Sequence, residues 1–525
     1  MARYKHYNLN QSKMIPLVYA DQIVEGSFEH ALGEIVEEQL DLSGFDAKYE
    51  NDETGRPAYD PRVLLKVVLY GYYKGIISSR SLAEACRRNV VFMALSADTR
   101  PHFTTIASFV RELGTEIVGL FQDVLLYASE LGLIGKEHFA VDGCKLPSNA
   151  SKQWSGTHEE LEDKRKKLES VAKKIVEKHR KRDEEEKDGP KAARDLKKAE
   201  AYQRKAKQLK EFLKRNDKKR GPTGQEQKSN LTDPESAKMK SSRGVLQGYN
   251  GLAVVDDRAQ IVVHAEAHGS GYEGHLLAPL LEATRKTFDT LKPGEDILSK
   301  VQVTADSGFH SRAVVAAVEA LGADAFIADR DLRRRDPAFA NAGRHKARSN
   351  SERARKRRQQ TKQKPVKDKC FTLSDFIYDE KKQQCTCPAG HRMYHSGKDM
   401  LFNGYRVCRF KAPLGACGGC HLRSQCLRHP ERTPQRTLTV IKDREGPRTL
   451  DAKRNEAINR MRRKLDTPAG REVYSRRMGT VEPVFGDLQN KGMRGFTLRS
   501  QRKVSVQWQL FTMVHNIEKI AHRWN

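Results

Sequence analysis

The sequence lacks both long apolar segments and a leader-like N-terminus. No stretch approaches the roughly 20 consecutive apolar residues that a membrane-spanning helix needs, and the mean hydropathy is −0.73. The N-terminal segment MARYKHYNLNQSKMIPL has neither an apolar core nor a small-residue cleavage site, so we expect no signal peptide. These absences argue against a membrane protein and a secreted protein, and they favour a cytoplasmic location.

Acidic residues are also in short supply. The chain has 525 residues, with 68 Asp and Glu against 96 Lys and Arg, a formal net charge of +28 and a pI of about 9.6. A charge surplus of this size opposes compaction by self-repulsion and is typical of a protein with a polyanionic partner. Nucleic acid is the leading candidate, because each phosphate that Lys or Arg neutralises releases counterions.

Cysteines are few, odd in number and unevenly placed. Six of the nine lie between Cys385 and Cys426. That distribution excludes a regular disulfide framework and predicts a cytosolic metal site. A Cys-x₂-Cys knuckle with further cysteines at a distance is typical of a closed, structural zinc site. We expect its ligands to be Cys387, Cys417, Cys420 and Cys426, with Cys385 and Cys408 as substitutes. An iron–sulfur cluster on the same thiolates, or free thiols, remain alternatives.

Two regions of the chain predict helices. Apolar residues recur at helical spacing between Pro61 and Leu95, which indicates a compact helical N-terminal unit that binds DNA or holds protomers together. The segment from Thr157 to Arg220 is intensely charged, with a thin apolar stripe on each of two helical faces. Asp188-Gly189-Pro190 separates these faces, so we expect a charged helical hairpin.

Two aspartates follow short apolar runs that read as strands. Asp142 comes after Phe139–Val141, and Asp306 comes after Val301–Ala305. Between and beyond them, strand-like and helix-like runs alternate, which predicts an α/β sheet domain. A strand end is a rigid mount, and two carboxylates on neighbouring strands are able to hold two Mg²⁺ ions.

Several motifs occur in a fixed order along the chain: FAVDGCKLPSNASK, LTDPESAKMK, QGYNGLAVVDD, VTADSGFHS and YSRRMGTVEPVFGDLQNKG. Together they resemble the DDE-type transposases of bacterial insertion sequences, and the likeness spans most of the chain. The segment PAYDPRVLLKVVLYGYYKGIISSRSLAEACRRN is similar to the helical N-terminal domain of many of them. The resemblance implies an RNase H-like mixed sheet core, with the first Asp ending the first strand and the second Asp ending the fourth.

The resemblance also implies the site residues. Asp142, Asp306 and Glu482 map to the catalytic ligands of Mg²⁺ (or Mn²⁺), and we expect Glu482 near a helix start, with Pro483 in the first turn. This group carries a Tyr–Arg–Glu–Lys signature, whose Arg and Lys contact the DNA backbone near the cut. It maps here with looser spacing, so Arg476 is a substitute for Arg477, Arg494 is a substitute for Lys491, and Asp487 is a rival to Glu482. The DNA-binding candidates are Tyr474, Arg477, Lys491 and Arg494.

On this basis the chain is expected to be a DNA transposase that cleaves element ends and joins them to target DNA. Its partners would be double-stranded DNA and further copies of itself, in the nucleoid of a bacterial cytoplasm. The alternatives are a catalytically inactive, transposase-derived DNA-binding regulator and a metal-dependent nuclease without strand transfer. The expected parts are a helical N-terminal domain (1–137), the RNase H-like core (138–154 and 226–330), the helical hairpin (155–225), a basic linker (331–369), a Cys-rich, zinc-ribbon-like module (370–435) and C-terminal helices with the catalytic Glu (436–525).

Overall fold

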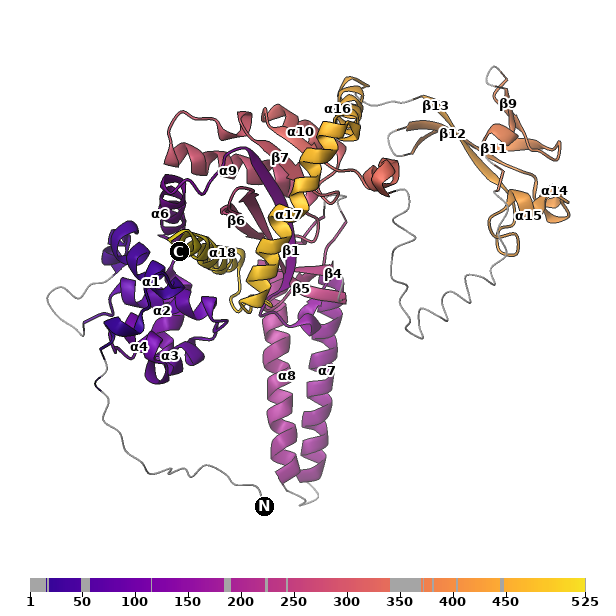
Figure 1. Cartoon of the computed structure of the whole chain (residues 1–525). Helices are drawn as coiled ribbons and strands as arrows, with labels where there is room; N and C mark the ends of the chain where they lie inside the picture. The colour runs from indigo at the N-terminus through magenta and orange to yellow at the C-terminus, as the bar shows by residue number, and fades with distance from the viewer. Residues whose placement is uncertain are drawn as a thin grey trace, which may run out of the picture. The chain divides into compact units, whose positions relative to one another are not determined.

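The computed structural model forms two compact units, which we describe separately (Figure 1). The first unit comprises 1–330 and 461–525, and the second comprises 331–460. Among the described residues, no helix combines the length and the apolar character that crossing a membrane requires. The described residues are 16, 18–48, 57–114, 116–183, 190–221, 225–241, 244–339, 370–371, 373–379, 382–402, 405–443 and 448–524. The expected break in the hairpin at 188–189 and most of the expected basic linker lie outside them.

A mixed sheet organises the first unit, with the strand order β4-β5-β1-β7-β8 and with β6 also paired to β5. β1 is antiparallel to β5 and parallel to β7, and β7 is parallel to β8. β5 is buried from Leu246 to Asp256, because strands flank it on both edges and helices cover its faces. The strands of this sheet are β1 (His138–Pro147), β4 (Ala237–Ser241), β5 (Gly244–Asp256), β6 (Val262–His268), β7 (Gln302–Ala305) and β8 (Asp324–Ile327). A separate two-stranded sheet comprises β2 (Ser155–Gly156) and β3 (Ser229–Asn230).

This sheet confirms the expected mixed α/β class and fits an RNase H-like core. Counting β1, β5, β6, β7 and β8 as the core strands, Asp142 lies in the first and Asp306 follows the fourth. The expected extent of the first strand was wrong. β1 continues past Asp142 to Pro147, because β5 remains beside it and supplies backbone partners as far as Gly248.

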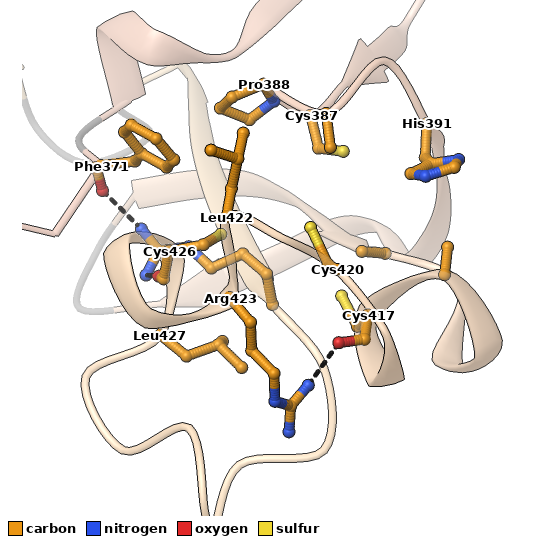
Figure 2. Close-up of a pocket in the computed structure, with 14 residues that line it drawn as sticks. Phe371, Cys387, Pro388, His391, Cys417, Cys420, Leu422, Arg423, Cys426 and Leu427 are labelled. Atoms are coloured by element: carbon orange, nitrogen blue, oxygen red, sulfur yellow. Dashed lines mark hydrogen bonds between the residues drawn. The ribbon is translucent and has the colours of Figure 1, made fainter.

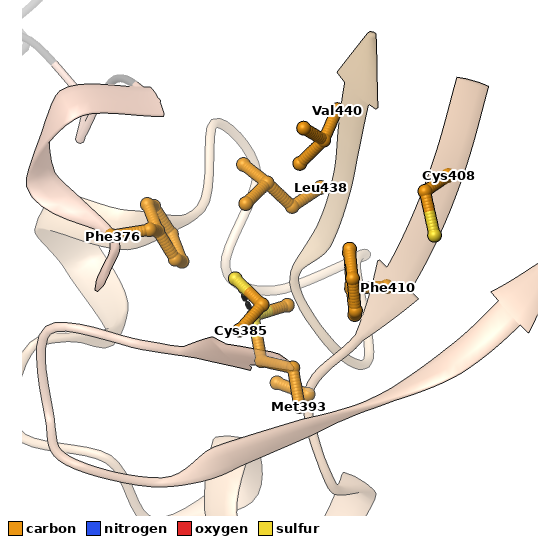
Figure 3. Packing of buried hydrophobic residues seen from close by; sticks show 8 residues of the cluster. Phe376, Cys385, Met393, Cys408, Phe410, Leu438 and Val440 are labelled. Atoms are coloured by element: carbon orange, nitrogen blue, oxygen red, sulfur yellow. Dashed lines mark hydrogen bonds between the residues drawn. The ribbon is translucent and has the colours of Figure 1, made fainter. Parts of the chain in front are cut away.

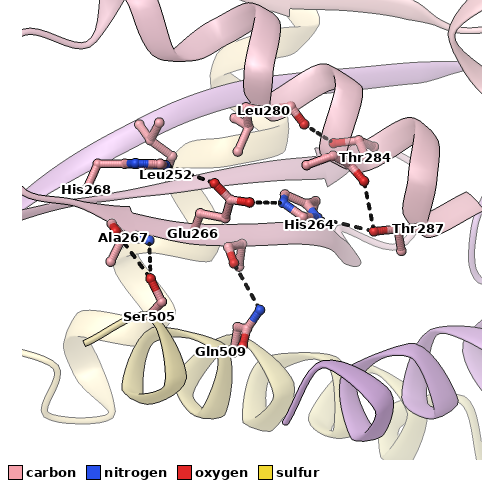
Figure 4. A network of polar contacts seen from close by, with 12 residues as sticks. Leu252, His264, Glu266, Ala267, His268, Leu280, Thr284, Thr287, Ser505 and Gln509 are labelled. Carbon is pink, nitrogen blue, oxygen red and sulfur yellow. Dashed lines mark hydrogen bonds and ion pairs between the residues drawn. The ribbon is translucent and has the colours of Figure 1, made fainter. Parts of the chain in front are cut away.

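Helices cover both faces of the sheet, and Figure 4 shows β6 between α9 (Leu277–Leu291) and α18 (Gln501–Trp524). On the α9 side, Glu266 accepts hydrogen bonds from His264 and His268 at 3.1 and 2.9 Å. These three side chains share a face because they alternate along the strand. The remaining helical segments here are η5 (Gly274–Leu276), η6 (Ile297–Ser299) and α10 (Arg312–Ala320).

Helix α18 joins the sheet to the N-terminal helices. The indole N–H of Trp508 donates to the carbonyl of Leu252 at 2.7 Å, and Asn516 bonds both the N–H and the carbonyl of Val262. Its other contacts are with α1, α2 and α6, so the helix is buried on several sides. The N-terminal helical segments are η1 (Ala20–Gln22), α1 (Phe28–Glu34), η2 (Ile35–Gln39), η3 (Ser43–Lys48), α2 (Pro61–Tyr73), α3 (Ser79–Arg88), α4 (Val90–Leu95), α5 (Phe103–Glu112) and α6 (Glu116–Glu130).

The charged segment after β1 forms two long helices, as its sequence predicts. After η4 (Lys152–Trp154), α7 (His158–Asp183) and α8 (Pro190–Arg215) lie side by side (Figure 1). Their apolar seam is thin, with Leu161 and Leu209 fully buried. The two helices carry 20 Lys and Arg against 10 Asp and Glu, so positive charges outnumber negative ones two to one on them.

The second unit contains a five-stranded sheet with the order β13-β12-β11-β10-β9. Figure 3 shows its small core, in which Phe376, Phe410 and Leu438 pack together. Its segments are α11 (Leu332–Arg335), η7 (Pro337–Phe339), η8 (Leu373–Asp375), β9 (Ile377–Asp379), β10 (Gln384–Thr386), β11 (Arg392–Phe402), β12 (Tyr405–Lys411), α14 (Leu414–Gly418), α15 (Arg423–Cys426) and β13 (Thr437–Asp443). The chain then returns through α16 (Arg448–Asp466) to α17 (Pro468–Asn490).

Candidate active site and cysteine pocket

Asp142 and Asp306 occupy equivalent positions on neighbouring strands. The parallel pairing of β1 with β7 ends at Val141 opposite Ala305, and each aspartate is the next residue along its strand. Adjacent strands lie about 4.8 Å apart, so the two side chains start close together. Burial raises the pKa of Asp142, and the charge of Asp306 raises it further. The sheet therefore brings these two predicted site residues together.

Arg477 of α17 pairs directly with Asp142. Its Nη1 lies 2.8 Å from Asp142 Oδ2, and the two side chains are only 11% and 22% exposed. The Gly143 N–H donates to the other carboxylate oxygen, Oδ1, at 2.8 Å. Tyr474 lies one helical turn before Arg477, with its ring centre 6.0 Å from the guanidinium. The guanidinium thus neutralises half of the aspartate pair.

A third carboxylate, Glu273, lies beside the pair and was missed by the sequence reasoning. It follows β6 in the loop SGYEGH, and its Oε1 is 2.8 Å from Nζ of Lys145 on β1. Burial raises the pKa of Glu273; the contact with Lys145 lowers it, and Asp306 and Asp142 raise it. The sequence around Glu273 shows no periodic pattern of apolar residues that would mark it. Only the fold identifies it, because the loop after β6 lies near Lys145 and Asp306.

The site combines three carboxylates with two cationic side chains. They are Asp142, Asp306 and Glu273, with Arg477 and Lys145. The carboxylates are largely buried where the pairing of the interior strands β1 and β7 ends, and there mutual repulsion is strong and a cation is favoured. Hard carboxylate oxygens are the ligands that Mg²⁺ and Mn²⁺ take in proteins. The donor set therefore fits a divalent cation, with Arg477 and Lys145 supplying positive charge to the same carboxylates.

Glu482 does not join this cluster in the structure. It lies well inside α17 rather than near a helix start, because the helix begins at Thr467 and Pro468, where Thr467 caps the Gly470 N–H. It lies five positions after Arg477, which is about 140° around a helix, and its side chain is exposed. Val481, Val484 and Phe485 pack inward as expected.

Pro483 is therefore a proline in a helix interior, where it removes one hydrogen bond. The carbonyl that it would have engaged belongs to Gly479. That carbonyl accepts a hydrogen bond from the Gln260 amide at 3.0 Å instead. The lost bond is thus replaced from the β5–β6 turn, and α17 continues to Asn490.

Lys491 and Arg494 are placed very differently. Lys491 is 6% exposed, and its ammonium contacts Asp487 and, at 2.6 Å, Glu518. His515 adds a contact of 2.7 Å to Asp487, so this group ties the end of α17 to α18. Although Asp487, His515 and Glu518 are close enough to hold a metal, Lys491 already supplies their counter-charge. Arg494 is exposed, as a residue that contacts DNA must be.

Four cysteines of the second unit line one pocket, shown in Figure 2. Cys387 comes from the turn after β10, Cys417 and Cys420 from the region of α14, and Cys426 from α15. Burial is the main cause that raises the pKa of Cys426. The charge of Arg436 lowers this pKa, and the other three cysteines of the pocket raise it further. His391 lines the same pocket and is an additional nitrogen donor that the cysteine spacing did not reveal. Four thiols, or three of them with the imidazole, fit a tetrahedral zinc ion.

The two cysteines expected as substitutes lie elsewhere. Cys385 on β10 and Cys408 on β12 belong to the hydrophobic core of the second unit (Figure 3). Cys385 contacts the sulfur of Met393 at 3.7 Å, and Cys408 lies 3.1 Å from Nδ1 of His395. Both therefore pack in the hydrophobic core. The cysteines that line the pocket are the four named first as zinc ligands from the sequence.

Comparison with known protein families gives two matches. Residues 386–521 match the model described as a transposase DDE domain, and residues 18–112 match the model described as a transposase domain (DUF772). The first range includes Glu482 and the cysteine pocket, whereas Asp142 and Asp306 lie outside both. Searches of curated proteins and of solved structures returned no match. Two transposase-domain models match this chain, and both matches are consistent with a DDE-type insertion sequence transposase, in agreement with the resemblance found in its motifs.

Proposed function

We propose that this transposase cleaves DNA at the ends of its element and transfers the freed strands to target DNA, using divalent metal held by Asp142 and Asp306. The single observation that carries the proposal is the register of β1 and β7, which sets the two aspartates side by side. The resemblance adds Glu482 as the third ligand. Its side chain is exposed on α17, the same helix that carries Arg477.

Mg²⁺ or Mn²⁺, when bound, would activate the attacking water or 3′-hydroxyl and stabilise the leaving oxygen. Asp142 and Asp306 would hold it from the rigid strands, with Asp306 Oδ1 oriented by the Gly308 N–H at 2.9 Å. Arg477 would exchange its carboxylate partner for a DNA phosphate, since a guanidinium binds both oxyanions in the same geometry. Tyr474 and Arg494 would contact the DNA backbone beside it. Lys491 would do so only after leaving Asp487 and Glu518.

DNA binding would draw on the cationic surfaces. The helices α7 and α8 carry a net charge of +10, and electrostatic attraction to phosphate supplies most sequence-independent affinity. The N-terminal helices would read element ends or join protomers, in a synaptic complex of two or more chains in the bacterial nucleoid.

For the second unit we propose a structural zinc ion on Cys387, Cys417, Cys420 and Cys426. The shared pocket supports this ligand set. The unit's hydrophobic core is small, and a closed metal site adds folding free energy where a core is small.

A DNA cleavage assay tests the proposed activity. The purified chain would be incubated with Mg²⁺ and DNA carrying the sequence that flanks its own gene. We expect nicks at the element ends and joined products with wild type, neither with Asp142→Asn, and both with Glu282→Gln, an α9 residue paired with Arg285. Binding without cleavage in Mg²⁺ and Mn²⁺ would contradict the proposal in favour of a DNA-binding regulator, and nicks without joining would indicate a nuclease.

A further inference from the structure

We propose that Glu273 is a further metal-binding carboxylate of the Asp142–Asp306 site, and that Lys145 is the counter-charge which a bound cation displaces from it. This inference rests on the proposed function, because it takes the two aspartates to be metal ligands. It differs from the ligand set implied by the resemblance, in which Glu482 is the only glutamate.

The first support is the geometry around Gly308. A Cβ placed on Gly308 would lie 3.0 Å from Asp306 Oδ1 and 3.6 Å from Glu273 Oε2. The two carboxylate oxygens are therefore at most about 6.6 Å apart, the sum of these distances. Mg²⁺ binds oxygen at about 2.0–2.1 Å and keeps several of its waters, so an ion with one such water spans this separation. A glycine at position 308 leaves the space between the two carboxylates open.

The second support is the anchoring of Glu273 from two sides. Oε1 is held by Lys145 at 2.8 Å, which leaves Oε2 as the oxygen near Gly308 and Asp306. The backbone of Glu273 is fixed where β6 leads into η5 and α9, and the Leu276 N–H donates to its carbonyl at 2.9 Å. Its side chain is 12% exposed.

The third support is Asn250 on β5, which lies directly opposite Lys145 in the β1–β5 pairing. Cross-strand partners project from the same face of a sheet, so Asn250 lies on the face where Lys145 meets Glu273. Its amide is fully buried, and neither its oxygen nor its nitrogen has a hydrogen-bond partner among the described groups. The amide oxygen lies 3.1 Å from the Cβ position of Gly143, which shares the Lys145 face, whereas Asp142 projects from the opposite face of β1. Burying an unpaired amide costs roughly 1–3 kcal/mol, and a water shared with the Lys145–Glu273 pair would satisfy it.

The electrostatics agree with this geometry. Burial raises the pKa of both Glu273 and Asp142, and each is raised further by neighbouring carboxylates. Three carboxylates share two cationic partners, Arg477 and Lys145, and a divalent cation would supply the missing positive charge.

The test is a titration of the full-length, zinc-loaded chain with Mn²⁺ alone, in which free Mn²⁺ is followed by electron paramagnetic resonance. The double variant Asp142→Asn, Asp306→Asn measures Mn²⁺ binding outside the site, and this background is subtracted from every titration. We expect Glu273→Gln to weaken the site-specific Mn²⁺ binding by about tenfold or more. The matched control Glu282→Gln, an α9 residue paired with Arg285, should bind as wild type does.

Lys145→Gln separates a metal ligand from a structural ion pair. It frees Glu273 from its counter-charge, so we expect tighter Mn²⁺ binding, the opposite direction to Glu273→Gln. Wild-type binding in Glu273→Gln, or weaker binding in both variants, would overturn the inference while leaving the aspartate site intact. Equal binding by wild type and by the double aspartate variant would instead contradict the proposed function itself.

Discussion

Removing the Arg477 guanidinium should loosen β1 unless a metal ion takes its place. In Arg477→Gln, Asp142 loses the guanidinium that lies 2.8 Å from its carboxylate. The negative charges of Asp306 and Glu273 remain nearby. Breaking a fully buried ion pair from one side costs about 3–5 kcal/mol. Because Asp142 is 22% exposed, we reduce this to about 2–3 kcal/mol for the opening of β1.

Hydrogen exchange of the β1 peptide, 138–147, measures that opening locally and avoids assuming a single unfolding transition for a chain with two units. In EDTA, a loss of about 2–3 kcal/mol corresponds to exchange about 30- to 160-fold faster. Saturating Mg²⁺ should restore most of the protection, since the ion neutralises the same carboxylate. In wild type, Mg²⁺ should increase the protection of β1 by a smaller factor, because the ion must first displace Arg477 from Asp142.

The neighbouring Arg476 supplies the matched control. It is 47% exposed and 3.9 Å from Glu472, so Arg476→Gln should change protection by less than about 0.5 kcal/mol. The reasoning would be refuted if Mg²⁺ protected β1 equally in wild type and Arg477→Gln, since the arginine and the ion would then not share Asp142.

Three further outcomes are expected. Burial, with a contribution from Arg476, lowers the pKa of His138 to about 4, so the unfolded chain binds a proton that the native state does not between about pH 6.5 and 4. Stability should therefore fall by about 3 kcal/mol as the pH drops through that window, and denaturant unfolding of His138→Gln should lack this loss. Cys420→Ser should lose bound zinc by metal analysis, whereas Cys408→Ser should keep it, because only the former lines the pocket. Gln260→Ala should cost about 1 kcal/mol in denaturant unfolding by removing the hydrogen bond to the Gly479 carbonyl; no change would show that water replaces the amide there.

The sequence was informative where one apolar run determined one element. The runs before Asp142 and Asp306 predicted two strands, and the Asp256-Asp257 turn joins β5 and β6 as a hairpin. The pattern did not reveal that β1 continues to Pro147, because its polar second half is held by pairing with β5 rather than by burial of its own side chains.

The site was harder to predict where it depends on segments far apart in sequence. Glu273 lies in a loop without an apolar period, and its contacts are with β1 and the turn after β7. Pro483 wrongly suggested a helix start beside Glu482, since its effect on α17 is offset by Gln260, more than two hundred residues away. Likewise, cysteine spacing alone did not separate pocket residues from Cys385 and Cys408, which the sheet of the second unit buries in its core.

The most direct test of the central claim is a metal-specificity switch at Asp306. In Asp306→Cys a soft thiolate replaces a hard carboxylate, and thiolate is a poor ligand for Mg²⁺ but is accepted more readily by Mn²⁺. If Asp306 binds the catalytic ion, the variant should leave element-end DNA uncut in Mg²⁺ and regain strand cleavage in Mn²⁺. Wild-type cleavage by this variant in Mg²⁺ would show that Asp306 holds no metal, and it would contradict the proposed active site.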